Sequence, residues 1–425
     1  MTSPEQSLDM SEDDTLPERP VRGAERLVSL DFIRGVAVLG ILFANITAFA
    51  HPMLAYSWPD ALPGGATLAD DAIWLFQFVF IDGKFRALFS LLFGAGMMLF
   101  MERVWARGGS RWLQARRLFL LMLFGLAHFY LLFVGDILFL YSIAGLLVLP
   151  MLCWSAERQF WSGLVWYLLG ALILTGLLAM PAVIEAHPAA APDQWQTMMA
   201  GWQDRIDEAA RETSVMQQGS YGDIVAFRFA EQSGQLAELL IVVLFETAPL
   251  MVLGMALYRR GFFMAPLDSS QRLLWSVVAL IGGVLLSLPL GLWAIETGFP
   301  PFLTQFLFNG PSAFPRLAVS LGMAGLLTLW APVCARSWLG SRVIAAGRMA
   351  FSNYVGTSAL MLLIFQGWAG GLYGDLHRMA LLPIVLLGWI AMLGWSKSWL
   401  TTFRYGPLEW LWRCLAYGKA FNIKR

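Results

Sequence analysis

Residues 28–50 read VSLDFIRGVAVLGILFANITAFA, and this stretch decides the fold. An α-helix needs about 20 mainly apolar residues to cross a hydrocarbon core about 30 Å thick, and this stretch supplies them. Comparable stretches recur at about 68–103, 115–134, 136–154, 160–183, 236–258, 272–297, 316–335, 349–370 and 379–401. They predict an all-α protein, a polytopic transmembrane helical bundle of about ten spans.

The composition agrees with a bilayer environment. Hydrophobic residues make up 58% of the 425 positions and charged residues only 14%, whereas soluble domains are about 25% charged. The chain therefore lacks the polar side chains that a water-facing surface requires, and its expected partner is the lipid bilayer. A net charge of zero argues against a nucleic-acid partner. Three cysteines without CxxC spacing and four histidines without an HExxH pattern predict no metal site.

Three regions follow from this pattern. Residues 1–25 are polar and acidic and predict a disordered cytoplasmic tail. Residues 26–401 form the transmembrane domain, in which 184–235 is an amphipathic outer loop that either lies on the outer leaflet or covers an outer cavity. Residues 402–425 place aromatic and basic side chains together and predict an interfacial cytoplasmic tail.

The positions of Arg and Lys predict the orientation. With the N-terminus in the cytoplasm, ten spans bring most basic residues to the cytoplasmic side and return the C-terminus there. The outer side then keeps Arg205, Arg211, Arg228, Arg316 and Arg378. The arrangement predicts a multipass protein of a bacterial inner membrane with both termini cytoplasmic.

Charged residues inside the predicted spans are candidates for a functional site, because a charge at mid-bilayer is expensive and usually has a partner inside the bundle. The second stretch carries Asp82, Lys84 and Arg86 at its centre, which predicts a break in that helix. Glu246 lies within a span without a neighbouring cation, so Lys84 or Arg86 is its expected partner. Asn353 is a further polar group in the ninth span.

Helical spacing groups the other candidates. Arg34 and Asn45 are eleven residues apart, nearly three turns, so both lie on one face with Arg34 about 16 Å nearer the cytoplasm. Arg117 and His128 repeat this spacing, and Asp136 returns close to the same face. An arginine at the inner surface suits a phosphate group, and a deeper histidine suits proton transfer.

Each of these candidates also has a structural interpretation. Arg116 and Arg117 are typical positive-inside anchors, and a histidine in an apolar helix is often an interhelical hydrogen-bonding group. Asp31 and Arg34, three residues apart, can neutralise one another or share a substrate. Glycine-rich runs at 94–96 and 282–283 indicate close helix packing.

Several motifs together resemble the YeiB family of bacterial inner-membrane proteins, which contain domain of unknown function 418. They are the stretch from Arg26 to Asn45, the run from Gly83 to Gly96, His128 with Gly135–Tyr141, Glu246 through Tyr258, Gly347–Tyr354 and Gly406–Arg413. The first helix is also similar to those of two groups of transmembrane acyltransferases, the acyltransferase-3 group and the group of heparan glucosaminide acetyltransferase.

The acyltransferase-3 pattern places a histidine eleven residues after an arginine, where this chain has Asn45 after Arg34. Asparagine cannot act as a base, so the resemblance implies that the base lies elsewhere, at His128 or at His51. One hypothesis is acyl transfer from cytoplasmic acyl-CoA, as co-substrate, to a small-molecule or glycan acceptor. His128 and Asp136 would then be catalytic, and the binding residues would be Asp31, Arg34, Asn45, Lys84, Arg86, Arg117, Glu246 and Asn353. The alternative is a transporter or flippase for an anionic or amphiphilic solute. No resident cofactor or metal is expected, and the pattern leaves the oligomeric state open.

Overall fold

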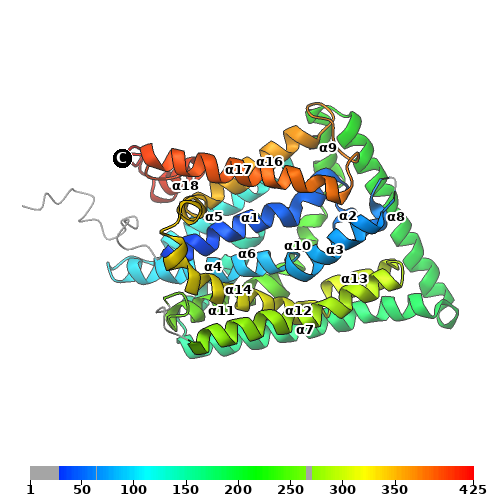
Figure 1. Cartoon of the computed structure of the whole chain (residues 1–425), viewed down its shortest axis with the longest axis horizontal. Helices are drawn as coiled ribbons and strands as arrows, with labels where there is room; N and C mark the ends of the chain where they lie inside the picture. Colours follow the sequence, from blue (N-terminus) through cyan, green and yellow to red (C-terminus); the bar gives the residue numbers. More distant parts are fainter. Residues whose placement is uncertain (1–27, 64, 265–269) are drawn as a thin grey trace, which may run out of the picture.

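A computed structural model describes residues 28–63, 65–264 and 270–425, which form helices without any β-sheet. The predicted all-α bundle is confirmed, whereas the predicted tail of residues 1–25 lies outside the described residues. Most helices run along the long axis of the molecule (Figure 1).

Seven stretches are long and apolar enough to cross a membrane. They are α1 (Val28–Ala50), α3 (Leu68–Phe80) with α4 (Lys84–Trp105), α7 (Ala156–Ala186), α10 (Gln235–Val242) with the π-helix η6 (Val243–Thr247) and α11 (Ala248–Arg259), α12 (Ser270–Glu296), α14 (Ala313–Cys334) and α17 (Arg378–Thr402). Three more of the predicted spans coincide with α5 (Arg111–Leu131), α6 (Leu138–Val148) with η4 (Leu149–Cys153), and α16 (Ala350–Phe365). Every predicted span is therefore helical, and the number of crossings stays a prediction.

The remaining helices connect the spans or cover their ends. They are α2 (Leu54–Ser57), η3 (Pro59–Ala61), η5 (Pro188–Ala190), α8 (Pro192–Gln218), α9 (Tyr221–Ala230), α13 (Pro301–Asn309), α15 (Trp338–Arg348) and α18 (Pro407–Tyr417).

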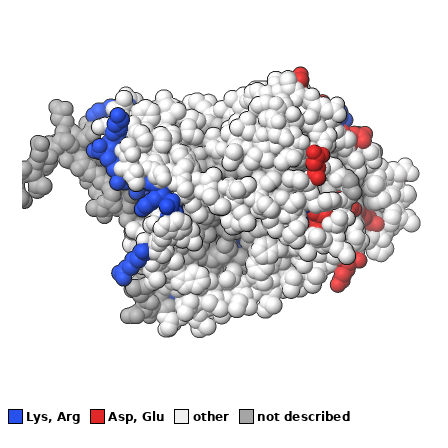
Figure 2. Space-filling view, turned by 45° about the horizontal axis from the view of Figure 1, so that its top comes forward, with Lys and Arg blue, Asp and Glu red and all other residues white. Residues whose placement is uncertain are grey.

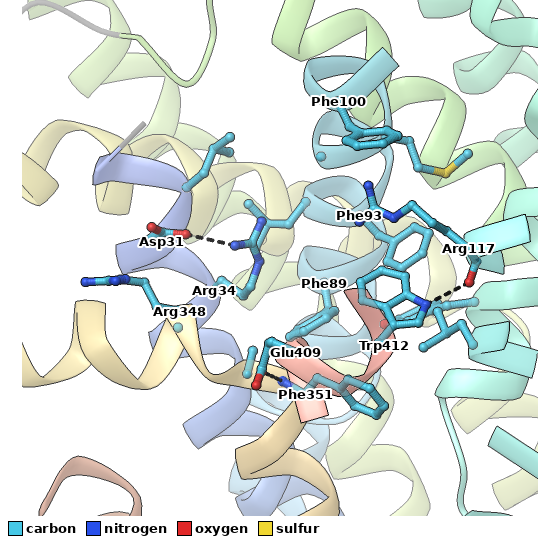
Figure 3. A pocket seen from close by; sticks show the side chains of 18 of the residues that line it. Asp31, Arg34, Phe89, Phe93, Phe100, Arg117, Arg348, Phe351, Glu409 and Trp412 are labelled. Carbon is cyan, nitrogen blue, oxygen red and sulfur yellow. Dashed lines mark hydrogen bonds and ion pairs between the residues drawn. The ribbon is translucent and has the colours of Figure 1, made fainter. Parts of the chain in front are cut away.

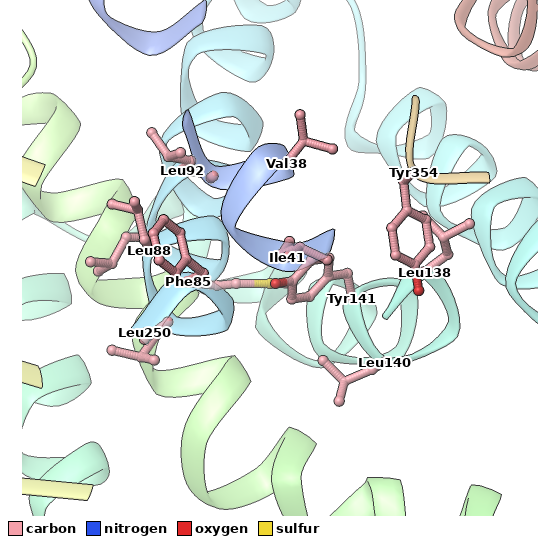
Figure 4. Packing of buried hydrophobic residues seen from close by; sticks show 14 of the residues in the cluster. Val38, Ile41, Phe85, Leu88, Leu92, Leu138, Leu140, Tyr141, Leu250 and Tyr354 are labelled. Atoms are coloured by element: carbon pink, nitrogen blue, oxygen red, sulfur yellow. The ribbon is translucent and has the colours of Figure 1, made fainter. Parts of the chain in front are cut away.

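Helix α1 is the centre of the bundle. In its most apolar stretch 78% of the residues are buried, against 17% in α12 and 28% in α7 and α17. The outer helices therefore present apolar side chains outward, which is favourable in lipid and unfavourable in water. Around Ile41 of α1, Phe85 and Leu88 pack on one side, and Tyr141 and Tyr354 lie on the other (Figure 4).

Charges separate to the two ends of the bundle. In the view of Figure 2, most Lys and Arg lie at the end where α1 begins, Asp and Glu lie mainly at the opposite end, and the surface between them is mostly uncharged. Three of the arginines predicted for the outer side, Arg228, Arg316 and Arg378, are buried in the fold. Of the five arginines predicted for the outer side, Arg205 and Arg211 are thus the exposed ones, a distribution consistent with the predicted orientation.

The expected break in the second span is confirmed. Helix α3 ends at Phe80, α4 begins at Lys84, and Gly83 between them adopts a left-handed conformation with φ 73°. A Cβ atom on Gly83 would lie 2.3 Å from Nε of Arg316. The glycine therefore provides both the turn and the space in which that arginine packs.

Two reciprocal glycine contacts bring helices close together. A Cβ atom on Gly94 of α4 would lie 1.9 Å from the carbonyl oxygen of Met251, and one on Gly254 of α11 would lie 2.0 Å from that of Leu91. The predicted packing role of the first glycine run is confirmed at Gly94. In the second run the role is confirmed at Gly283, where such a Cβ would lie 2.6 Å from a side-chain carbon of Val319 on α14, whereas Gly282 has no heavy atom within 4 Å.

Helices α8 and α9 cap the acidic end of the bundle (Figure 1). Glu212 of α8 is buried, and its carboxylate accepts hydrogen bonds from the Met53 amide at 3.2 Å and from the Tyr373 hydroxyl at 3.3 Å. The ring of Trp202 packs edge-on against Trp58, 5.0 Å between centroids. The amphipathic outer helix expected in 184–235 is thus docked on the protein itself through these contacts.

Replacing Gly254 by Leu should separate α4 from α11, because the added side chain meets backbone atoms that cannot move aside. Overpacking of this kind lowers stability by about 1–3 kcal/mol. The thermal unfolding midpoint in detergent should fall, whereas Gly282→Leu, with open space around it, should leave the midpoint unchanged. Equal midpoints for the two variants would contradict the close α4–α11 contact.

The cap should loosen as the pH rises. Burial raises the pKa of Glu212 to about 7, so the folded state binds its proton more tightly than the unfolded state does. This contribution, at most about 3 kcal/mol, is complete below the unfolded pKa of about 4.5 and disappears as the pH passes 7. The unfolding midpoint should fall between pH 6 and 8, a trend that Glu212→Gln removes and Asp204→Asn, on an exposed position of α8, keeps. A wild-type midpoint independent of pH would refute this assignment.

Candidate functional site

A cavity of about 310 Å³ lies between α1, α4, α5, α6, α16 and α18. Six arginines belong to its lining: Arg34, Arg103, Arg117, Arg348, Arg404 and Arg413. The farther part is aromatic and aliphatic, and includes Phe89, Ile137, Tyr141 and Tyr354. Because arginines gather at the basic end of the bundle, the cavity suits a molecule with an anionic head and an apolar or weakly polar body.

Arg34 and Arg117 enter the cavity from opposite sides (Figure 3). Nη1 of Arg34 lies 2.9 Å from Oδ1 of Asp31, and about a quarter of the arginine side chain is exposed. The Arg117 guanidinium lies between the rings of Phe100 and Trp412, 3.9 and 4.5 Å from their centroids. Such stacking fixes the plane of a guanidinium while its N–H edges still point outward.

Helix α18 forms one wall of the cavity. Trp412 donates a hydrogen bond to the carbonyl of Arg117 at 2.9 Å. Glu409 accepts hydrogen bonds from the amides of Phe351 and Ser352 and from the Ser352 hydroxyl (Figure 3). A carboxylate at these free N–H groups stabilises the N-terminus of α16. The tail that the sequence predicts to be interfacial is therefore also part of the candidate site.

His128, Asp136 and Ser358 form a buried polar chain just behind the cavity. Nδ1 of His128 lies 2.8 Å from Oδ1 of Asp136, and Nε2 lies 2.9 Å from Oγ of Ser358. The amide of Phe139 donates a hydrogen bond to the other carboxylate oxygen of Asp136 at 2.5 Å. None of the three side chains belongs to the cavity lining.

The ring of Tyr354 separates this chain from the cavity. It lies 4.8 Å from the His128 ring, and its hydroxyl accepts a hydrogen bond from the Ile137 amide and donates one to the Gly135 carbonyl. Tyr354 is also one turn before Ser358 on α16. The polar chain is thus one side chain away from the cavity.

The contact between His128 and Asp136 determines the tautomer of the imidazole. A carboxylate oxygen and an unprotonated ring nitrogen 2.8 Å apart would repel each other, because both carry lone pairs. We therefore assign the ring hydrogen to Nδ1, the nitrogen that faces Asp136. The two atoms are within ion-pair distance, although the N–H does not point straight at the oxygen. Nε2 is then free to accept the proton of the Ser358 hydroxyl.

A second cluster lies at the break between α3 and α4. Arg86 makes a two-pronged ion pair with Glu246, 3.0 Å for each of its hydrogen bonds, and Arg316 donates a further hydrogen bond to the same carboxylate. Of the two partners that the sequence offers for Glu246, Lys84 and Arg86, the structure pairs the carboxylate with Arg86. The carboxylate sits in the π-helix η6, a local distortion that often marks functional positions.

Four other candidates lie apart from the cavity lining. Lys84 turns back and donates to the carbonyl of Phe78, at the C-terminal end of α3. The Asn353 amide donates hydrogen bonds to the Ala346 carbonyl and the Ser396 hydroxyl, and its oxygen accepts one from the Trp395 indole. These bonds connect α16 to α15 and α17. The cavity lining does not include these two side chains, Arg86 or Glu246.

Asn45 and His51 lie farther along α1. Asn45 is one turn beyond Ile41, the last cavity residue of this helix, and it is partly exposed although α1 is otherwise mostly buried. His51 follows the outer end of α1, where burial lowers its pKa to about 4. His128 is therefore nearer to the cavity than His51.

The sequence does not predict two of the residues in these clusters, Ser358 and Arg316. Ser358 looks like any small residue of an apolar helix, and only the fold brings it to His128. Arg316 is expected at the outer surface because the predicted span begins at that residue. Helix α14 instead begins at Ala313, and one further turn places Arg316 inside the bundle.

Replacing Glu246 by Gln should destabilise the protein strongly, because Arg86 and Arg316 then remain charged and unpaired inside the bundle. Breaking a buried pair on one side costs about 3–5 kcal/mol. Glu238→Gln is the matched control, since its pair with Arg205 is exposed and worth less than about 1 kcal/mol. Thermal unfolding in detergent should show a large drop for the first variant alone. Similar midpoints would show that Glu246 does not hold the two arginines.

Known proteins match this chain along most of its length. Residues 257–419 match the family model described as "Protein of unknown function (DUF418)". The uncharacterised protein YeiB of Escherichia coli is 33% identical over 92% of this chain and 96% of its own length. The uncharacterised protein YxaH of Bacillus subtilis is 29% identical over 94% of this chain and 96% of its own. No solved structure matches. With this identity over nearly the full length, the chain belongs to the YeiB family.

Proposed function

We propose that this membrane protein transfers an acyl group from a cytoplasmic acyl-CoA to an acceptor reached from the outer side of a bacterial inner membrane. The observation that carries the proposal is the 2.8 Å contact of His128 with Asp136, one aromatic ring away from an arginine-lined cavity. An acyl-CoA has the chemistry that this cavity suits, namely phosphates at one end and a thioester at the end of a long, weakly polar arm.

The arginines would hold the phosphates of the donor. Arg34 and Arg117 are predicted binding residues, and both line the cavity. The same lining also contains Arg103, Arg348, Arg404 and Arg413. Planar guanidinium groups bind phosphate oxygens in a two-pronged manner, so the donor would be fixed in orientation as well as in place. Lys84, Arg86 and Arg116, also considered for this role, do not belong to the lining.

His128 would act as the general base, and Asp136 would keep its Nδ1 protonated and stabilise the imidazolium that forms. A developing oxyanion needs a hydrogen-bond donor. Two asparagines are among the predicted binding residues. Asn353 is occupied by its own hydrogen bonds, whereas none of the hydrogen bonds among the described residues uses the Asn45 side chain. Asn45 is therefore the donor that we assign.

The ion cluster at the α3–α4 break supports a second candidate, the transport of an anionic amphiphile coupled to protons. Ionisable residues at broken helices are typical of secondary transporters. In this alternative the Arg86–Glu246–Arg316 group would change its pairing during transport.

Purified protein with radiolabelled acetyl-CoA should bind the donor and release free CoA. His128→Ala should lower the rate of release by about 10²–10⁴, the usual contribution of general acid–base catalysis. His187→Ala is the control, because His187 is exposed in the loop after α7. Absence of CoA binding, or equal rates in the two variants, would exclude acyl transfer. Uptake of radiolabelled laurate by proteoliposomes under a pH gradient, without CoA release, would favour transport.

A further inference from the structure

We propose that Ser358 is the nucleophile of this protein and carries the acyl group as an ester between donor and acceptor. The inference rests on the acyl transfer proposed above and adds a covalent intermediate on a residue that the sequence does not single out.

The first argument is the connectivity of the buried polar chain. Oγ of Ser358 lies 2.9 Å from Nε2 of His128, whose Nδ1 lies 2.8 Å from Oδ1 of Asp136. A hydroxyl, an imidazole and a carboxylate in this order are the parts of an activated serine, and they are recognised by geometry on unrelated folds. The Ser358 hydroxyl therefore has two acceptors within reach, the Tyr354 carbonyl at 3.1 Å and Nε2 of His128 at 2.9 Å, and only the second is a base that can take its proton.

The second argument is that a purely structural role would not require this arrangement of Ser358, His128 and Asp136. A serine in a helix satisfies its hydroxyl on the carbonyl four residues earlier, and Ser358 has this option at 3.1 Å from the Tyr354 carbonyl. A histidine needed only to join two helices requires one partner. Here the imidazole contacts one residue on each nitrogen, one from α16 and one from the loop after α5, and all three side chains are almost completely buried. A deep site excludes the water that would hydrolyse an ester.

The third argument is the position relative to the cavity. Tyr354 lines the cavity and Ser358 is the next turn of the same helix, so an acyl group passing the tyrosine ring reaches Oγ directly. Among the described residues, two aromatic rings contact the His128 ring, those of Phe133 and Tyr354. Only Tyr354 of these two also lines the cavity. Movement of this ring opens the way to Ser358.

The chemistry balances in two steps. Oγ of Ser358 attacks the thioester carbonyl, an O–C bond forms, and the C–S bond breaks. The hydroxyl proton passes to Nε2 of His128 and then to the leaving sulfur, which departs as CoA thiol. In the second step His128 takes the proton of the acceptor hydroxyl, the acceptor oxygen attacks the ester, and the proton returns to Oγ as the Ser358 bond breaks.

A phosphonylating probe tests the nucleophile without acyl-CoA. Diisopropyl fluorophosphate should label the purified wild-type protein on Ser358, as peptide mass spectrometry would show. Labelling should fall at least 100-fold in Ser358→Ala and in His128→Ala, and it should stay unchanged in Ser398→Ala, a control serine on an exposed position of α17. Tyr354→Ala should speed labelling, because it removes the ring in front of the site. If neither the wild type nor Tyr354→Ala is labelled on Ser358, or if labelling persists in His128→Ala, the proposal is wrong.

Acyl-CoA then separates this inference from the function on which it rests. With radiolabelled acetyl-CoA and no acceptor, the label should appear on Ser358 with an equal amount of free CoA. CoA release at the wild-type rate in Ser358→Ala would overturn the nucleophile and leave acyl transfer standing, with His128 acting directly on the acceptor. Probe labelling of Ser358 without any binding of CoA would support the nucleophile and overturn acyl-CoA as its donor.

Discussion

Two guanidinium groups hold the Glu246 carboxylate inside the bundle, and much of the surrounding backbone is arranged to make this possible. The break between α3 and α4 brings Arg86 to the carboxylate, and Gly83 leaves room for Arg316. The π-helix η6 turns Glu246 toward both of them. Because unpaired charges in hydrocarbon are so unfavourable, any packing of α4, α11 and α14 that separates these three side chains would be disfavoured.

The second organising feature is the separation of the two polar groups along the bundle. The arginine-lined cavity and the His128 chain share the space around α1, α5 and α16, whereas the Glu246 cluster belongs to α4, η6 and α14. Tyr141 lies between these regions, since it lines the cavity and donates a hydrogen bond to the carbonyl of Arg86 at 3.1 Å. Tyr141 is therefore a side chain that contacts both regions.

Hydropathy was sufficient to predict the helices, because every long apolar stretch is helical and the break at Gly83 follows from charges in its middle. Helical spacing was less informative about contacts. Asp136 was expected to follow His128 on one helical face, yet α5 ends at Leu131 and the contact arises because the loop folds back. Ser358 and Arg316 depend on tertiary packing and on one turn of helix, which a single sequence does not resolve. Lys84 and Asn353 show the reverse case, in which polar residues that look functional are used to hold helix ends and neighbours.

The pairing at Glu246 also leaves one positive charge in excess, since two guanidinium groups face a single carboxylate. Arg86 lies near the middle of the 38-residue stretch Leu68–Trp105, which is long and apolar enough to cross a membrane, so this charge is held far from both ends of that stretch. A full elementary charge crossing the membrane exchanges about 2.3 kcal/mol per 100 mV, so a charge at half depth experiences roughly half of that. A membrane potential that is negative inside would pull a positive charge held at such a depth toward the cytoplasm, and the pull would act on α4 and α14.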